Sequence, residues 1–343
     1  MTNVFRKPNF ATFALFIFSL LASPIFAQKV EPAKKDSLNE RYPRYPLLKI
    51  ASISYDYAGQ SDYKIKYKDA PDESGEFSRG RMQAYLWLPF YRGTYFTWSV
   101  TEIYTREDYD LKNVVNPSGT YVSGRETLED FNTMVNMNWR TKIGTKQFVV
   151  NASAMVGSSP AFRYQKVSGQ VYGLVILKDV PNTIYSVGAA VLIDPSSPLP
   201  VVPVAQYWHR FENKKWEVDI VVPQWAKIRR SETLGGWLSA GAEFASQSFF
   251  IRNLPGQQST TYENAFSEIT PNIGYDNLLF GNLMLTVQGG YRINMGGRLG
   301  EVNDPARDKI ANIDFGSGWY GKAMLTYVIP NKAIRQTLDK AMN

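Results

Sequence analysis

The chain has 343 residues, of which 44% are hydrophobic and 14% aromatic, and it contains no cysteine, which excludes disulfide bonds and lipid attachment to a thiol. Lys and Arg number 38 against 31 Asp and Glu, a net charge of +7. The positive residues are scattered singly, so we expect no nucleic-acid partner. A mean hydropathy of −0.28 is too low for a helical membrane protein.

The first residues predict a cleavable export signal over 1–27. Arg6 and Lys7 supply its positive region, the apolar region covers 13–21, and small residues lead to cleavage before Gln28. The next segment, 28–47, is charged, contains proline and shows no hydrophobic period. It predicts a flexible periplasmic leader.

From Leu48 onward, hydrophobicity alternates every second residue in bouts of about ten residues, the pattern of a transmembrane β-barrel. In 128–140 the alternation places Asp130, Asn132, Asn136, Asn138 and Arg140 on one face, and Phe131, Val135, Met137 and Trp139 on the other. One face suits water and the other suits lipid. The sequence therefore predicts an all-β fold, an antiparallel up-and-down barrel over 48–330.

Fourteen segments carry this pattern. They are 48–57, 76–88, 94–105, 128–140, 147–157, 163–177, 183–193, 201–211, 216–222, 225–232, 237–250, 262–275, 283–295 and 318–329. The pair divided at Pro223 is the least regular, because proline lacks the donor that a strand ladder needs. We predict 14 strands, with 12 as the alternative if short neighbours merge.

The connections between these segments alternate in length, as in outer-membrane barrels. Long polar connections are predicted at 58–75, 106–127 and 296–317, and short ones at 91–93 and 141–146. Short turns belong to the periplasmic side and longer loops to the outside. An even strand number then puts both chain ends in the periplasm.

Aromatic residues gather near the predicted strand ends, where their rings suit a membrane interface. Tyr85, Trp87, Tyr95 and Trp98 flank one predicted short turn. A soluble β-sandwich would also alternate and pack aromatic rings. It would not explain the alternating connection lengths, so we favour the membrane barrel.

The tail, 331–343, places Ile334, Leu338 and Met342 on one face of a helix. It predicts a short amphipathic helix or, equally well, a solvated end, because such short helices are marginal in water.

With the lipid face assigned, charged residues fall on the water-filled side. The residues expected to line the lumen are Asp56, Arg81, Asp130, Arg140, Glu217, Asp219, Glu243, Glu268, Arg292 and Lys322. Mixed charges can hold water and select ions in an open pore, or they can pair across a narrow lumen and close it. The sequence leaves both possibilities open.

No catalytic, metal or cofactor site is predicted. His209 is the only histidine. Barrel deacylases and phospholipases carry a serine two residues after the histidine, whereas this chain has Phe211 there. Glu217 and Asp219 share a strand face, which suits lumen polarity better than an acid–base pair. The acidic segment 69–76 lacks the spacing of a calcium loop, and the glycine-containing segments form no phosphate loop.

The glycine-rich strands at 171–177 and 185–193, and the segment "VVPVAQYWHRFENKKWEVDIVVPQW" at 201–225, resemble uncharacterised outer-membrane β-barrel families of Gram-negative bacteria. The resemblance implies the cell outer membrane, with its lipid and lipopolysaccharide as neighbours, and insertion by the barrel assembly machinery. Many such barrels end on an aromatic residue, whereas this chain continues past Tyr327 to Asn343.

We therefore expect a channel or transporter for an unknown small solute, and no enzyme. The alternatives are a plugged structural or surface-interaction barrel and a lipid-modifying enzyme.

Overall fold

The computed structural model describes residues 48–115, 121–159, 164–252 and 261–329. The predicted export signal, leader and C-terminal tail lie outside these residues. No helix among the described residues is long and apolar enough to cross a membrane.

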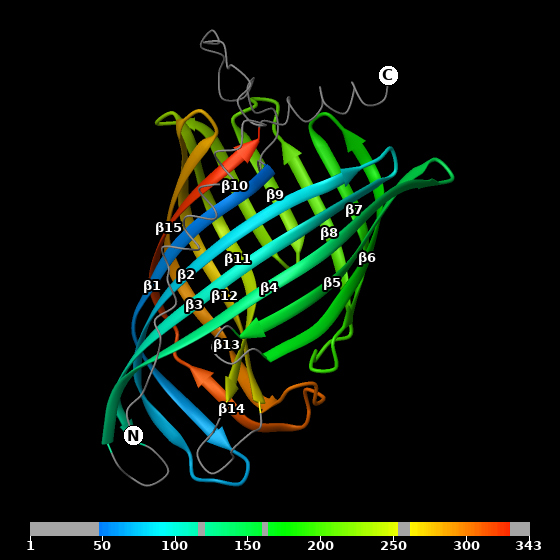
Figure 1. Ribbon diagram of the computed structural model, residues 1–343. Helices are drawn as coiled ribbons and strands as arrows, with labels where there is room; N and C mark the ends of the chain where they lie inside the picture. Colours follow the sequence, from blue (N-terminus) through cyan, green and yellow to red (C-terminus); the bar gives the residue numbers. More distant parts are fainter. Residues whose placement is uncertain (1–47, 116–120, 160–163, 253–260, 330–343) are drawn as a thin grey trace. The chain divides into compact units, whose positions relative to one another are not determined.

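Fifteen strand segments make up the described chain (Figure 1). They are β1 Leu48–Tyr67, β2 Glu73–Arg92, β3 Phe96–Val115, β4 Tyr121–Ile143, β5 Lys146–Ser159, β6 Tyr164–Val180, β7 Thr183–Ile193, β8 Val201–Arg210, β9 Trp216–Val222, β10 Trp225–Thr233, β11 Gly236–Arg252, β12 Thr261–Phe280, β13 Leu283–Glu301, β14 Lys309–Phe315 and β15 Gly318–Ile329. Each pairs antiparallel with its neighbours, and β1 pairs with β15 to close the ring. The predicted antiparallel barrel of 14 strands is confirmed.

Two of the segments, β14 and β15, share one position in the barrel between β13 and β1. β15 pairs with the first half of β1, whereas β14 pairs with Tyr63–Tyr67 at its far end. The break falls at Gly316, whose N–H donates to the Asp62 carbonyl, and a Cβ on Gly316 would lie 2.6 Å from that oxygen. Fifteen segments therefore occupy fourteen positions.

Leu48 pairs with Ile329, so β1 begins and β15 ends at the same end of the barrel, here called the terminal end. The opposite end, here called the distal end, carries the β1–β2 connection at 68–72 and the β7–β8 connection at 194–200. Figure 1 shows β1–β4 and β12–β14 reaching the distal end, below the shorter β7–β10.

The long loops predicted at 58–75, 106–127 and 296–317 are mostly strand, which corrects the sequence interpretation. β1 continues to Tyr67 and β14 lies within the third segment. The alternation persists there but its faces are reversed: Tyr63 is buried inside, whereas Lys64 and Lys66 are exposed outside. A strand that stands beyond lipid presents charge outward, so it resembles a polar loop in sequence.

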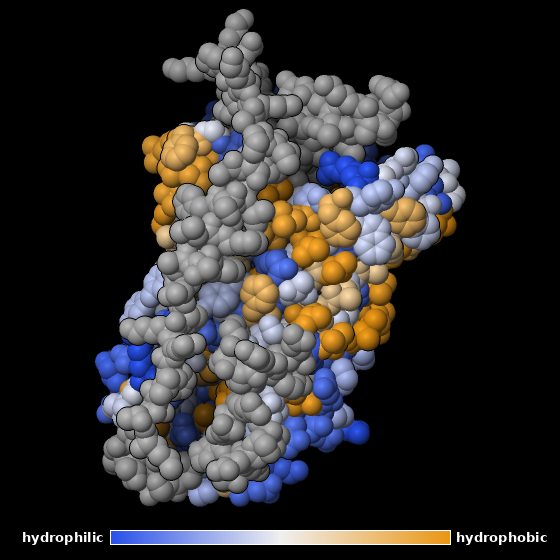
Figure 2. All heavy atoms as spheres, viewed as in Figure 1, coloured by the Kyte–Doolittle hydropathy of each residue, from blue (hydrophilic) through white to orange (hydrophobic). Residues whose placement is uncertain are grey.

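The two faces of the wall differ as a membrane barrel requires. Tyr55 is 54% exposed and points outward, whereas its neighbour Asp56 is 4% exposed and points into the lumen. On the face visible in Figure 2, apolar side chains cover the middle of the barrel and hydrophilic ones gather at the distal end. Inside the distal end, Phe77, Tyr109 and Phe315 pack together as an aromatic core.

A substitution at Gly188 on β7 tests how closely the backbones of β6 and β7 approach each other. A Cβ at Gly188 would lie 1.8 Å from the Gly173 carbonyl oxygen on β6. We expect Gly188→Ala to reduce the free energy of unfolding by about 1–3 kcal/mol, because the backbones must separate. The measurement is urea unfolding of the refolded barrel, followed by tryptophan fluorescence.

The matched control is Gly321→Ala on β15, where a Cβ meets nothing within 4 Å. Equal unfolding midpoints for the two variants would contradict the close approach of β6 and β7.

Candidate functional site

The structure places the ten predicted lumen residues in different surroundings. Buried side chains belong to Asp56, Arg81, Asp130, Glu217, Asp219, Glu268 and Arg292. Glu243 and Lys322 are half-buried, and Arg140 is exposed near the end of β4. The structure brings four of them together, Asp56, Arg81, Glu268 and Arg292, in one connected group.

This group, here called the lumen ion network, also contains Arg79 and Glu107. Arg81 Nη1 lies 2.7 Å from Glu268 Oε1, and Arg79 Nη2 lies 2.8 Å from Glu268 Oε2. Arg81 Nε also contacts Glu107 Oε1, at 2.5 Å. Arg292 pairs with Asp56 at 2.5 Å and approaches Glu268 at 3.3 Å.

The lumen ion network crosses the interior of the barrel. β2, which carries Arg79 and Arg81, is not a neighbour of β12, which carries Glu268, so their contacts run through the lumen. Three guanidinium groups face three carboxylates, and the network is neutral overall. Charges this deeply buried require such pairing, because an isolated one would be very costly.

Sequence reasoning missed Arg79 and Glu107 for different reasons. Arg79 shares the strand face of Arg81 within the predicted strand 76–88, so the same alternation could have identified it. Glu107 lies in 106–127, which the sequence predicts as a loop, so the alternation assigns it no face. Once β3 is extended to Val115, its alternation places Glu107 inside.

Glu217 and Asp219 are paired along the wall and do not form an acid–base pair with each other. Glu217 accepts from Arg210 Nε at 2.9 Å, and Asp219 accepts from Arg229 Nη1 at 2.9 Å. Trp225 donates its indole N–H to Asp219 at 2.9 Å. Each carboxylate on β9 is therefore neutralised by an arginine on an adjacent strand, β8 or β10.

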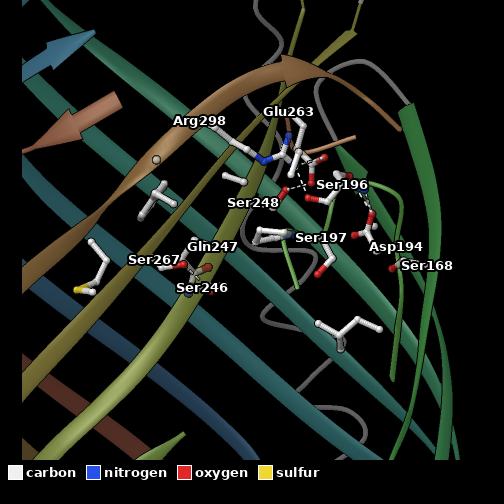
Figure 3. A pocket seen from close by; sticks show the side chains of 18 of the residues that line it. Ser168, Asp194, Ser196, Ser197, Ser246, Gln247, Ser248, Glu263, Ser267 and Arg298 are labelled. Carbon is white, nitrogen blue, oxygen red and sulfur yellow. Dashed lines mark hydrogen bonds and ion pairs between the residues drawn. The ribbon is translucent and has the colours of Figure 1, made fainter. Parts of the chain in front are cut away.

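A cavity of about 1020 Å³ lies toward the distal end, here called the distal cavity (Figure 3). One wall is the inner face of β4–β6, with Asp130, Asn132 and Lys166; the other is formed by β11–β13. A Cβ on Gly157 of β5 would lie 3.5 Å from the ring of Phe250, so the distal end of β11 leans against the inside of β5.

Lys166 joins the two walls of the distal cavity. Its Nζ lies 3.0 Å from Glu263 Oε2 on β12 and 2.9 Å from Asp194 Oδ1 in the β7–β8 connection. Ser196 Oγ donates to Asp194 at 2.8 Å and lies 2.5 Å from the lysine. Burial raises the pKa of Asp194, but hydrogen bonds from Lys166 and Ser196 outweigh it and hold the pKa below its ordinary value.

The contact between Ser196 and Lys166 brings a hydroxyl close to an amine, as in some nucleophilic sites. A lysine must be neutral to accept the proton of a serine. The Lys166 amine instead donates hydrogen bonds to the carboxylates of both Asp194 and Glu263. The geometry therefore suits a structural ion pair.

His209 lies on the outer surface of β8 with Tyr207. Its Nδ1 is 2.9 Å from Thr183 Oγ1, and its ring stacks on the ring of Tyr207 with the two centroids 6.3 Å apart. The small pocket beside it, of about 390 Å³, is lined by Lys178, Thr183, Tyr185, Tyr207 and His209. Among the described residues, no group of His, Cys, Asp and Glu could hold a metal ion.

No family model matches the chain, and no curated protein matches it. Among solved structures, the outer-membrane phospholipase A from Escherichia coli is 10% identical, with 83% of this chain and 100% of that chain covered and a TM-score of 0.32. The outer-membrane protease OmpT from Escherichia coli is 9% identical, covering 81% and 96%, with a TM-score of 0.27. A TodX mutant, a monoaromatic hydrocarbon channel, is 10% identical, covering 82% and 91%, with a TM-score of 0.27.

The fold is that of an outer-membrane β-barrel. A fold by itself does not determine an activity, because the activity depends on the site that the fold carries.

Glu268→Gln tests the lumen ion network. The change leaves Arg79, Arg81 and Arg292 facing only two carboxylates. We expect the free energy of unfolding to fall by about 3 kcal/mol, because an uncompensated buried charge remains. The measurement is urea unfolding in micelles.

Glu126→Gln on β4 is the control, because Glu126 is exposed. A loss of stability no larger than that of the control would show that the network is not required for folding.

Proposed function

We propose that this protein is a gated channel for a small solute in the outer membrane, closed in the conformation described here. Its terminal end would face the periplasm and its distal end the outside. The observation that carries the proposal is the polar middle of the interior, in which a charge network crosses the lumen.

Several buried polar atoms on the inner face support a hydrated lumen. Ser153 Oγ, Asn272 Oδ1, Arg292 Nη1 and Thr326 Oγ1 have no hydrogen-bond partner among the described residues. Leaving such an atom dry costs about 1–3 kcal/mol. These atoms lie on β5, β12, β13 and β15, so we infer that water reaches much of the circumference.

The barrier in this hydrated lumen would be the lumen ion network. It links β2 and β3 on one side to β12 and β13 on the other, and β1 contributes Asp56. A barrier of ion pairs can separate without exposing apolar surface, because water solvates the released charges. An apolar plug would oppose opening much more strongly.

Arg81→Ala together with Glu268→Ala tests the barrier. The double change removes one charge of each sign and keeps the network neutral. We expect a larger and more frequent single-channel current in planar bilayers than for the wild type, because the contact between β2 and β12 is lost.

The control pair is Arg125→Ala with Glu126→Ala on the exposed part of β4. A folded double variant that carries no current would contradict the channel and favour a plugged structural barrel. Hydrolysis of bilayer lipid by the same preparation would instead point to a lipid-modifying enzyme.

Ion selectivity provides a separate test. Arg292→Gln leaves the network with a net charge of −1, and Glu107→Gln leaves it with +1. We expect the reversal potential in a salt gradient to shift toward cation selectivity in the first variant and toward anion selectivity in the second. Identical reversal potentials would show that ions do not pass the network.

A further inference from the structure

The hydrogen-bonded ladder around the barrel is interrupted at the distal end, where β7–β10 stop short between β6 and β11; this interruption is here called the lateral window. The pairing of β10 with β11 ends at Glu243, and that of β7 with β6 ends at Gly169. Beyond these points, no described strand pairs with 245–251 of β11 or with 166–168 of β6 on these edges. The β7–β8 connection and the turn at Pro223 form the terminal-side border of the window.

At this window the lining of the distal cavity includes the outward face of β11. Leu238 and Phe244 point outward from β11 and are 40% and 38% exposed. Ser246 and Ser248 follow at the same alternate positions, yet they line the distal cavity, as Phe244 also does. One strand face is therefore lipid-facing near the terminal end and cavity-facing near the distal end.

The neighbouring strands repeat this arrangement. On β12, the outward face carries Ile273, which is 64% exposed, and then Ser267 in the cavity. On β13, the exposed Val287 and Ile293 precede Met295, which lines the cavity. The outer surface of β11 and β12 thus passes from apolar side chains to hydroxyl groups along the barrel axis, whereas β13 adds the apolar Met295 to the cavity.

The cavity end of this surface is polar but carries little net charge. Ser246 Oγ lies 2.8 Å from Ser267 Oγ, and Ser248 donates to Glu263 at 2.6 Å (Figure 3). Lys166 and Arg298 are matched by Asp194 and Glu263. Hydroxyl and amide groups of a ligand would find partners here, whereas a charged head group would face a site that is already neutralised.

We propose that the distal cavity binds an amphiphile with an uncharged, hydroxyl-rich head group, such as a glycolipid or alkyl glycoside. The head group lies among Ser246, Ser248 and Ser267, and the alkyl chain leaves through the lateral window past Phe244 and Leu199. This ligand class rests on the proposed channel function. Because the test below measures binding and not ion flow, a failure of the ligand assignment can be told apart from a failure of the channel.

The test uses thiol protection, because the chain contains no cysteine. The Ser248→Cys variant of the full chain is reconstituted in phosphatidylcholine vesicles and labelled with a pyrene maleimide that partitions into the bilayer. Dodecyl maltoside at about ten times its dissociation constant should slow labelling about tenfold. Maltose, which lacks the chain, and dodecylphosphocholine, which has a charged head group, should slow labelling less than about twofold at the same concentration.

Two controls keep the result specific. Thr145→Cys, in the exposed β4–β5 turn, should be labelled at the same rate with and without dodecyl maltoside. Leu199→Asp in the Ser248→Cys background should abolish most of the protection, because it places a charge in the path of the alkyl chain. If Ser248→Cys does not fold, Ser246→Cys replaces it.

Three outcomes would overturn the proposal. Protection by maltose equal to that by dodecyl maltoside would show a site for soluble sugars only. Equal protection by dodecylphosphocholine would remove the selectivity for uncharged head groups. Labelling by a water-soluble maleimide but not by the bilayer probe would show that the window does not open to lipid.

Discussion

Inside a lipid bilayer each backbone N–H and C=O group needs a partner within the protein, since no water is available to replace it. Closure of the sheet between β1 and β15 supplies these partners around the whole ring. The constraint also explains where the ring is allowed to open. The unpaired edges of β6 and β11 lie at the distal end, where the outward side chains change from apolar residues to serines and charges. An unpaired backbone edge is tolerated where it borders water or a polar cavity.

The interior follows from a second cost, that of burying charge. Arg79, Arg81 and Arg292 can remain inside because carboxylates on β1, β3 and β12 face them across the lumen. Such a network contributes little net stability compared with a well-packed apolar core of the same volume. Its presence therefore suits a lumen whose contents can be exchanged. The aromatic core of Phe77, Tyr109 and Phe315 at the distal end has the opposite character and fixes that part of the barrel.

Two further contacts accompany the leaning of β11 and β12 into the barrel. The ring of Phe250 packs beside Gly157 on β5, and Glu263 pairs with Lys166 on β6. An outward strand position thereby becomes part of an internal wall. The distal cavity results from this displacement, which joins a lipid-facing surface to the inner face of β4–β6.

The sequence by itself determined the antiparallel barrel and most strand positions, and it favoured 14 strands over 12, because alternation at period two reports which side chain meets lipid and which meets water. It also placed Asp56, Arg81, Glu268 and Arg292 on one face. It could not show that these four meet, because their strands are far apart in sequence and a strand pattern carries no information across the lumen. It misread the distal strands as loops, since beyond lipid the charged face turns outward, as at Lys64 and Lys66. Only the tertiary structure decided that Ser246 and Ser248 line a cavity, because the lean of β11 depends on contacts with Gly157 and Lys166 from distant strands.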